Sequence, residues 1–442
     1  MLTSLLSLAL AAGLVDARAV KSSGTGNAPP LATSFPTPSE DPFYTIPANI
    51  SKYANGAVVR ARTVETTEFQ AAINARQVLY RTTNRAGKAT GTVTTVYIPP
   101  VPASPPQILS LQSFEDALNI RCAPSWANVN SSSTQEEYLA SYLDPIGGFA
   151  LANGYYFINS DDEDEDSEWL VGITEGRATL DGVRAAINDL NLWSPKVALI
   201  GYSGGAHESV WAASLAAAYA PELDIVGAAF GGTPIDPKLG YELLNGSPDA
   251  ALAGGALVGY ANGYPKLNRT LNKILTAKGK QVFAEFRGAD ACIVESAAAF
   301  AGVNFSSPEY FKSNPLDNKE VQHVQKIESL LENVSPLPIP VPKFPRFEWH
   351  GLNDTTVPYA PEAEYIQQQC AKGADIVFVS YPGLDHTEAA VIGLPGALLF
   401  VQEAFKGTLT KTKCAKSTSI HHPPPFTVQR RHQHQHQQQY KA

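Results

Sequence analysis

Apolar and polar residues alternate along much of the chain in blocks whose lengths suit strands and helices in turn. Short apolar runs bounded by Asn, Gly and Pro predict strands, and longer stretches with apolar residues every three or four positions predict helices. In residues 176–189, for example, Leu180, Val183 and Ile187 fall on one helical face. The predicted strands are residues 76–83, 91–98, 107–111, 155–159, 196–201, 225–230, 346–350 and 376–381; the predicted helices are residues 176–189, 205–220 and 395–405.

Strands and helices follow one another in the middle of the chain and again near its end. The strands at 196–201 and 225–230 are apolar almost throughout, which indicates burial on both faces. This order predicts an α/β fold, with a mainly parallel central sheet and helices on both faces.

The alternation stops after Thr233. Residues 236–336 are rich in Ala, Gly and Leu, and their pattern is helical with no clear strands. We expect them to form a mostly helical cap, inserted over the carboxyl edge of the sheet. The core then comprises residues 46–235 and 337–415.

Both ends of the chain differ from this core in composition. Residues 2–15 are apolar apart from Thr, Ser and Gly, and residues 17–19 (ARA) offer small side chains for cleavage, so residues 1–19 predict a signal peptide and secretion. Residues 20–45, rich in Pro, Ser, Thr and Gly, predict an extended lead-in. Residues 416–442, rich in His and Gln, predict a disordered tail in preference to a metal-binding tract.

Composition narrows the classes of function. Hydrophobic residues make up 44% of the chain and charged residues 17%, as in globular proteins. The formal net charge of −9 argues against a nucleic-acid partner, because phosphate binding needs clustered Lys and Arg. After the signal sequence, no run approaches the roughly 20 apolar residues of a membrane span, so no transmembrane segment is expected.

Four cysteines, with no CxxC pair, fit an oxidising compartment. They can form two disulfides in any of three connectivities. Seven N-x-S/T sequons fit a glycoprotein, although so short a motif also recurs by chance. The cysteines are Cys122, Cys292, Cys370 and Cys414; the sequons begin at Asn49, Asn130, Asn245, Asn268, Asn304, Asn333 and Asn353.

A nucleophilic serine is indicated at the end of one buried strand. Residues 201–205 read GYSGG, which places a G-x-S-x-G motif between the strand at 196–201 and an Ala-rich helix. In this context the turn exposes the Ser203 hydroxyl and directs the backbone N–H of Gly204 at a developing oxyanion. An ordinary glycine-rich turn is the less favoured alternative.

The serine needs a base, and five of the nine histidines lie in the tail beyond Cys414. His207 shares a helix with Ser203 and predicts a structural role. His323 lies on a polar helical face, and His350 closes a strand, where we expect it to bond the backbone. His386 follows the last strand on a loop at the carboxyl edge of the sheet, so it is the predicted base.

The acid is expected between the serine and the histidine, as in the chain order of α/β hydrolases. Asp354 lies on the loop after the strand at 346–350 and fits this position. Asp385 and Glu388 are too close to His386 in the sequence to contact the far side of its ring, so we expect them to be exposed charges. A second oxyanion donor is expected after the strand at 107–111, where we choose the backbone N–H of Asp116.

The acidic run Asp161 to Asp166 raises the alternative of a calcium site. An EF-hand loop that starts at Asp164 would place Trp169 at the position that requires glycine. We therefore expect a solvated loop, with no bound metal and no cofactor.

Together these residues resemble the fungal secretory lipases of the lipase A type, over about residues 40–415. The acidic loop 161–168 and the His/Gln tail depart from the family pattern without touching the three residues of the predicted triad. The features that carry the resemblance are residues 201–206 (GYSGGA), Glu115 and Asp116 shortly before residues 122–125 (CAPS), residues 175–184 (EGRATLDGVR), His350-Gly351, Asp354, Val357-Pro358, and the placement of His386.

The resemblance implies an α/β-hydrolase fold, a helical cap that forms an acyl tunnel, and metal-free hydrolysis of lipid esters. In the family pattern Ser203, Asp354 and His386 form the triad, and Gly204 and Asp116 form the oxyanion hole. The resemblance also implies the disulfides Cys122–Cys292 and Cys370–Cys414, which is the pairing we favour.

We therefore expect a secreted serine hydrolase that cleaves carboxylic esters, most readily a triacylglycerol lipase. Its partner would be a lipid or another ester, including one presented at an oil–water interface. The alternatives are an esterase for short-chain or natural-product esters, a serine peptidase, and a non-catalytic binding protein on the same fold. The chemistry of Ser203, Asp354 and His386 argues against the last of these.

Overall fold

One mixed sheet runs through the part of the chain that the computed structural model describes, residues 36–64, 74–129, 134–288, 291–332, 340–412 and 414–418. In this part the sheet has ten strands, in the order β1-β2-β3-β5-β4-β6-β7-β8-β9-β10. The strands are β1 (Val58–Val64), β2 (Asn74–Thr83), β3 (Ala89–Ile98), β4 (Gln107–Gln112), β5 (Tyr156–Ser160), β6 (Lys196–Tyr202), β7 (Asp224–Gly231), β8 (Arg346–Gly351), β9 (Ile376–Tyr381) and β10 (Ala415–Thr418).

The sheet is antiparallel at one end and parallel over the rest. The pairs β1–β2, β2–β3 and β3–β5 are antiparallel. Every pairing from β5–β4 to β9–β10 is parallel. Parallel strands bring their carboxyl ends to one edge, so the loops after β4, β6 and β8 meet there.

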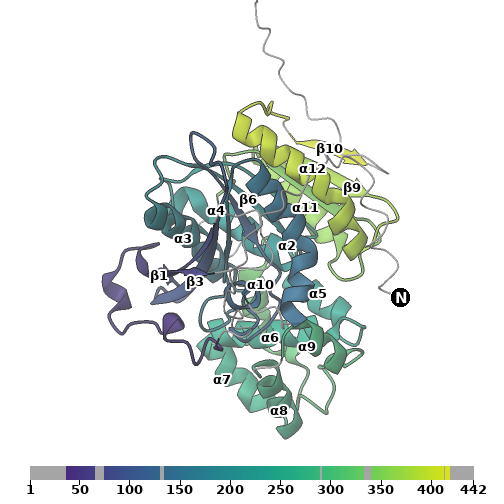
Figure 1. The fold of residues 1–442 in the computed structure, drawn as a ribbon. Coiled ribbons are helices and arrows are strands. Elements are labelled where there is room, and N and C mark those ends of the chain that lie inside the picture. The colour runs from purple at the N-terminus through teal and green to yellow at the C-terminus, as the bar shows by residue number, and fades with distance from the viewer. Residues whose placement is uncertain are drawn as a thin grey trace, which may run out of the picture. The chain divides into compact units, whose positions relative to one another are not determined.

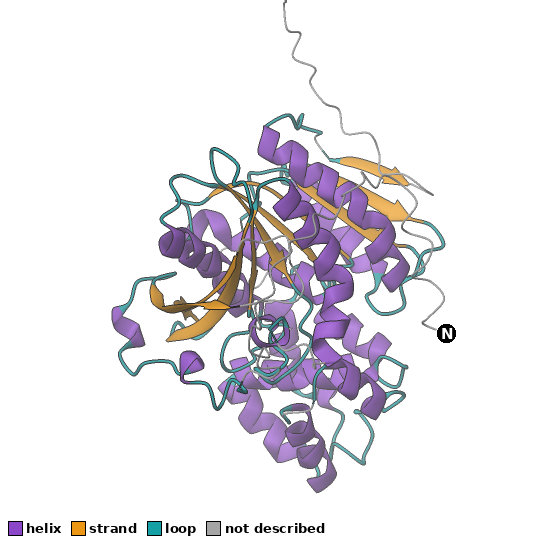
Figure 2. Cartoon of the chain, in the orientation of Figure 1, coloured by secondary structure: helices purple, strands orange, loops and turns teal. Residues whose placement is uncertain are grey.

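Helices cover both faces of the sheet (Figures 1 and 2). Successive residues of β6 divide between the two faces, with Ala198 and Ile200 in one buried cluster and Val197 and Leu199 in the other. The first cluster includes residues of α2 and α12, and the second includes residues of α3, α4 and α11. These helices are α2 (Thr134–Ala152), α3 (Gly172–Leu190), α4 (Gly204–Tyr219), α11 (Tyr359–Ala371) and α12 (His386–Lys406), and the short α1 (Pro124–Ala127) precedes α2.

Between β7 and β8 the described residues form six α-helices, and several of them gather at one end of the sheet (Figure 1). They share a separate apolar cluster that includes Leu257, Leu267, Phe286 and Val324. Their role as a cap stays a prediction. The helices are α5 (Pro237–Leu244), α6 (Ala250–Gly263), α7 (Pro265–Ile274), α8 (Ala277–Phe286), α9 (Ile293–Phe300) and α10 (Lys319–Glu328).

The eight predicted strands agree with β2 to β9 to within about two residues. The short edge strands β1 and β10 and the helices α1, α2 and α11 were not predicted. Residues 416–418, which the sequence placed in the tail, belong to β10. The signal peptide 1–19 and residues 419–442 lie outside the described residues.

The last helix begins nine residues earlier than predicted, at His386. Pro395, which suggested a helix start, lies inside α12, and the true start is capped by Asp385 and Glu388 in a capping box. Among the described helices, α12 alone is long and apolar enough to cross a membrane. It packs on β7 and β8, and 61% of its most apolar window is buried, as in a core helix.

Candidate active site

Ser203 occupies the turn between β6 and α4, as the sequence predicted. Its φ of 56° and ψ of −123° are unusual for a residue with a side chain. Such strained backbone costs about 1–3 kcal/mol and persists at functional sites, where the surrounding structure enforces it. The Ser203 N–H donates to the carbonyl oxygen of Gly231, 2.9 Å away, which fixes the turn against β7.

The glycines of this turn are required by close packing. A Cβ atom on Gly205 would lie 2.1 Å from the carbonyl oxygen of Gln112 in β4. A Cβ atom on Gly201 would lie 2.2 Å from the carbonyl oxygen of Gly205. Backbone atoms cannot yield to such contacts, so only glycine lets α4 approach the strands this closely.

His386 reaches Ser203 from the first turn of α12. Its Nε2 lies 2.8 Å from Ser203 Oγ, and its Nδ1 lies 2.6 Å from Asp354 Oδ2. The Tyr202 hydroxyl donates to the His386 carbonyl oxygen at 2.6 Å, which holds the start of the helix beside the serine. The structure thus brings Ser203, His386 and Asp354 into one hydrogen-bonded chain.

Asp354 lies on the loop after β8, and its carboxylate is fully engaged. Oδ1 accepts the backbone N–H groups of Thr356 at 2.9 Å and Val357 at 2.7 Å, while Oδ2 faces His386. Burial alone would raise the pKa of Asp354, but hydrogen bonds from His350 and His386 hold that pKa well below its usual range. Asp354 is therefore a carboxylate throughout the neutral pH range.

The other described histidines make no hydrogen bond to Ser203, and each has different partners. His207 Nδ1 is 2.6 Å from Glu175 Oε2, and the indole N–H of Trp211 donates to His207 Nε2, so this ring supports the core. His323 is exposed on α10. His350 contacts the backbone oxygen of Val357 at 3.0 Å, as predicted, but it also faces two buried carboxylates.

The two residues proposed from the sequence as oxyanion donors adjoin each other. Gly204 is the first residue of α4, where a helix leaves its N–H free of intrahelical partners. Asp116, after β4, has a φ of 48°, and its Oδ1 would lie 2.3 Å from a Cβ atom on Gly204. Burial raises the pKa of the Asp116 side chain to about 6, although the neighbouring His386 opposes that rise.

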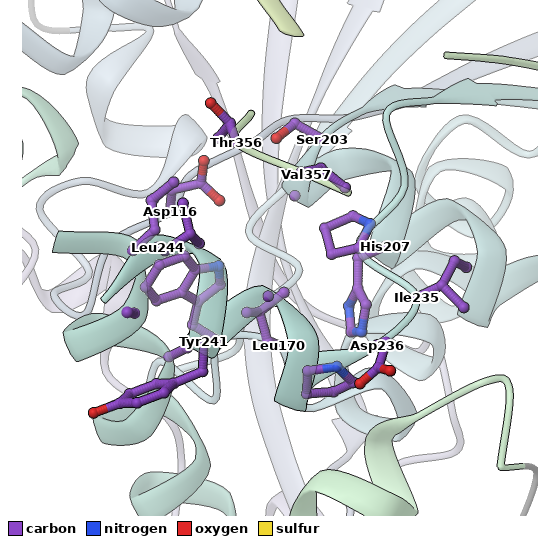
Figure 3. A pocket seen from close by; sticks show the side chains of 18 of the residues that line it. Asp116, Leu170, Ser203, His207, Ile235, Asp236, Tyr241, Leu244, Thr356 and Val357 are labelled. Carbon is purple, nitrogen blue, oxygen red and sulfur yellow. The ribbon is translucent and has the colours of Figure 1, made fainter. Parts of the chain in front are cut away.

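A cavity opens beside Ser203 and extends between the sheet edge and helices α5 and α6. Ser203, Asp116 and Thr356 lie together at one end in Figure 3, and the side chains of Leu170 and Tyr241 line the region beyond them. The walls are mostly apolar, so the cavity suits an aliphatic group. Other lining residues are Ile235, Leu244, Leu252, Ala256, Leu257 and Val357.

Both cysteine pairs favoured from the sequence are joined in the structure. Cys122, just before α1, bonds Cys292, the residue that precedes α9, across a separation of 170 residues. Cys370 in α11 bonds Cys414, just before β10, across 44 residues. The first bond links the segment that carries Asp116 to the helices between β7 and β8.

The prediction of a solvated loop for the acidic run was wrong for its first four residues, whereas Glu165 and Asp166 are exposed. Asp161, Asp162, Glu163 and Asp164 are each at most 3% exposed. The Asp161 carboxylate accepts the backbone N–H of Ser125 at 2.7 Å and its hydroxyl at 2.6 Å. Acidic runs are normally solvated because burying a charge is costly, but a protonated carboxyl avoids that cost.

Burial and the neighbouring carboxylates together raise the pKa of Glu163 and Glu208 well above the usual range. The same two effects act on Glu115, the residue before Asp116. Within the described ranges, no group of three or more His, Cys, Asp or Glu side chains has an arrangement that could hold a metal ion. The buried acids form a layer beside the site in which burial raises the pKa of each carboxyl group.

This layer predicts that the protein loses stability as the pH rises from about 4 to about 7. Burial raises the pKa of Asp161 to about 7 in the folded state, whereas in the unfolded state the pKa of this carboxyl is near 3.8. Between these values the folded state binds more protons than the unfolded state. Within that window Asp161 lowers the free energy of unfolding by about 1.4 kcal/mol per pH unit. Asp354, whose pKa is lowered, contributes the opposite trend only at more acidic pH.

Thermal unfolding at pH 5 and pH 8 measures this effect, and we expect the lower Tm at pH 8. Asp161→Asn is the matched control, because the amide can keep both contacts with Ser125 and does not titrate. Its Tm should fall less between the two pH values. A wild-type Tm that rises from pH 5 to pH 8 would contradict the prediction.

Two features of the site had no signal in the sequence. The first is the burial of the acidic run, and the second is the contact of His350 with Glu362 and Asp354. The acids are buried by elements distant along the chain. Glu362 lies close to His350 in the sequence, but the two side chains meet only because α11 packs beside β8, which residue spacing did not indicate.

Comparison with known proteins gives consistent matches. A sequence profile described as secretory lipase matches residues 127–412. The chain is 42% identical to lipase A of Moesziomyces aphidis over 385 residues, which cover 86% of this chain and 83% of the relative. It is 30% identical to a secreted triacylglycerol lipase of Malassezia restricta, with 84% and 80% covered.

A solved structure of Candida antarctica lipase A in its closed state superposes with a TM-score of 0.84 at 41% identity. The match covers 87% of this chain and 90% of that chain. An esterase of Xanthomonas oryzae superposes with a TM-score of 0.60 at 16% identity, which supports the fold alone. The α/β-hydrolase fold expected from the sequence is thereby confirmed.

Proposed function

Because this chain belongs to the secretory lipase family, we propose that it is a secreted triacylglycerol lipase with Ser203 as nucleophile. As a member of that family it is a carboxylic ester hydrolase. The observation that carries the proposal is the hydrogen-bonded chain from Ser203 through His386 to Asp354, at the mouth of an apolar cavity.

In the proposed reaction, Ser203 Oγ attacks the ester carbonyl carbon while its proton passes to His386 Nε2. The oxyanion accepts the backbone N–H groups of Gly204 and Asp116. The tetrahedral intermediate then collapses, and His386 gives the proton to the departing alcohol. Water, deprotonated by the same imidazole, hydrolyses the acyl-enzyme and frees the acid.

Asp354 supports both halves of this reaction. Its two backbone donors fix the carboxylate, and the 2.6 Å contact with Nδ1 holds the imidazole with Nε2 toward the serine. The carboxylate also stabilises the imidazolium that forms after proton transfer. The three residues come from the ends of β6 and β8 and the start of α12, whose positions the parallel sheet fixes.

The domain assignments extend the proposal. We assign residues 236–336 as a cap over the acyl site, because α5 and α6 supply much of the cavity wall. We assign residues 1–19 as a signal peptide that directs secretion. Two disulfides support a protein that folds in an oxidising compartment.

Hydrolysis of p-nitrophenyl esters from acetyl to palmitoyl tests the substrate class. We expect kcat/KM to rise with acyl length by up to about fourfold per methylene, since burying one methylene contributes about 0.8 kcal/mol. The rise should stop when the chain fills the cavity. Trioctanoin and triolein emulsions then test triacylglycerols directly.

Activity confined to acetyl and butyryl esters would contradict a lipase and favour a short-chain or natural-product esterase. No activity on any ester would favour a peptidase or a non-catalytic binding protein.

A further inference from the structure

We propose that His350 and Glu362 form a buried ion pair that positions Asp354. This inference rests on the proposed function, because Asp354 matters to turnover only if it orients His386. In the described part of the chain neither residue hydrogen-bonds Ser203, so both would act through the Asp354 carboxylate as positioning residues.

The pair lies directly behind the triad. His350, in β8, places its Nε2 3.1 Å from Asp354 Oδ2, the same oxygen that His386 Nδ1 approaches at 2.6 Å. On its other side His350 Nδ1 contacts Glu362 Oε2. The side chains of His350, Glu362 and Asp354 are all completely buried, so water cannot replace any of these contacts.

Both nitrogens of His350 face acceptors. Nδ1 faces a carboxylate oxygen, and Nε2 faces the carbonyl oxygen of Val357 at 3.0 Å as well as Asp354. A neutral imidazole has one N–H and would leave one nitrogen lone pair against an oxygen, whereas an imidazolium donates from both. Consistently, although burial would lower the pKa of His350, Glu362 and Asp354 raise it to about 10.

Glu362 is itself anchored to a neighbouring strand. Its Oε1 accepts the hydroxyl of Thr233 at 2.7 Å, just after β7. Next to Thr233, a Cβ atom on Gly232 would lie 3.1 Å from Cε1 of His386. The pair therefore ties Asp354 to the loop that also borders the catalytic imidazole.

The pair adds no net charge to the site, because the His350 cation balances the Glu362 anion. Neutralising His350 would leave two carboxylates behind His386 and favour its protonated form. Neutralising Glu362 would leave the His350 cation beside Asp354 and disfavour that form. The two changes should therefore move the acid limb of the activity profile in opposite directions.

Other titratable groups around the pair would not produce opposite shifts of the acid limb in the two variants. The ring of Tyr359 from α11 packs nearly perpendicular to the His350 ring, with centroids 5.5 Å apart, and is present in every variant. Glu348 of β8 faces Glu362, and burial raises its pKa to about 8, so it is mostly protonated in the acid limb. Asp249 accepts from Thr356 Oγ1 at 2.8 Å and is present in every variant.

The test is the pH dependence of kcat/KM for p-nitrophenyl butyrate from pH 4 to 9. We expect His350→Gln to shift the acid limb to higher pH by about one pH unit and to lower kcat about tenfold, with KM little changed. Glu362→Gln should shift the limb to lower pH. The double variant, which removes both charges, should return the limb close to its wild-type position.

Shifts of both single variants in the same direction, or no shift in either, would overturn the inference. Ser203→Ala separates this failure from failure of the proposed function: activity that survives in Ser203→Ala refutes the catalytic assignment itself. Retained Ser203 dependence with unshifted His350 and Glu362 variants refutes the ion pair alone.

A measurement on the wild-type protein covers variants that do not fold. With ¹⁵N-labelled imidazoles, we expect one histidine to keep both ring protons at pH 8, where ordinary histidines are neutral. Full deprotonation of every histidine by pH 8 would overturn the inference.

Discussion

Replacing Ser203 with alanine is expected to abolish ester hydrolysis and leave the fold intact. The alanine lacks the Oγ that lies 2.8 Å from His386 Nε2, so no acyl-enzyme can form. In serine hydrolases with this chemistry, loss of the nucleophile lowers kcat by about a millionfold. Initial rates on p-nitrophenyl esters measure the loss, and circular dichroism with thermal unfolding tests the fold.

A serine on the same helix provides the matched control. Ser209 is buried in α4, where its hydroxyl bonds the Gly205 carbonyl oxygen at 2.7 Å and the Gln112 side chain at 2.9 Å. Ser209→Ala removes a hydroxyl of the same kind without touching His386, so turnover should stay within a few-fold of wild type. Turnover by Ser203→Ala above the background rate would mean that another group is the nucleophile.

Loss of the Cys122–Cys292 disulfide is expected to be the largest single loss of stability. The bond closes a loop of 170 residues, and in the chain-entropy model such a loop corresponds to about 5 kcal/mol. Cys122→Ala/Cys292→Ala removes the bond with no new polar group in the buried site. Denaturant unfolding of the double variant beside wild type measures the change in unfolding free energy.

The second disulfide is the matched comparison, because it closes a loop of only 44 residues. The same model gives about 4 kcal/mol for Cys370→Ala/Cys414→Ala, so the longer loop should lose more. Asp116 lies shortly before Cys122, just outside the longer loop, so we expect a modest fall in kcat for the first variant alone. Equal or reversed losses of stability would contradict the entropic account.

The order of strands and helices around Ser203 could be predicted from the sequence because it depends on neighbours along the chain. Apolar runs in the sequence indicate the strands. The glycines of residues 201–205 indicate the turn, because a side chain at Gly201 or Gly205 would clash with the closely packed backbone. His386 and Asp354 followed from their positions after strands, since parallel strands end at one edge. Two helices were predicted incorrectly for local reasons. Pro395 suggested a helix start inside α12, and the apolar residues of α2 show no clear helical periodicity.

The burial of residues 161–164 and the contacts of His350 were decided only by the tertiary structure. A carboxyl group is charged or neutral according to the atoms packed around it, and those atoms come from α1, α3 and α4. Likewise, Glu362 meets His350 only because α11 packs against the sheet beside β8. Hydrophobic periodicity records whether a residue faces the core, whereas the charge of a buried group depends on the partners that the packing of separate elements brings against it.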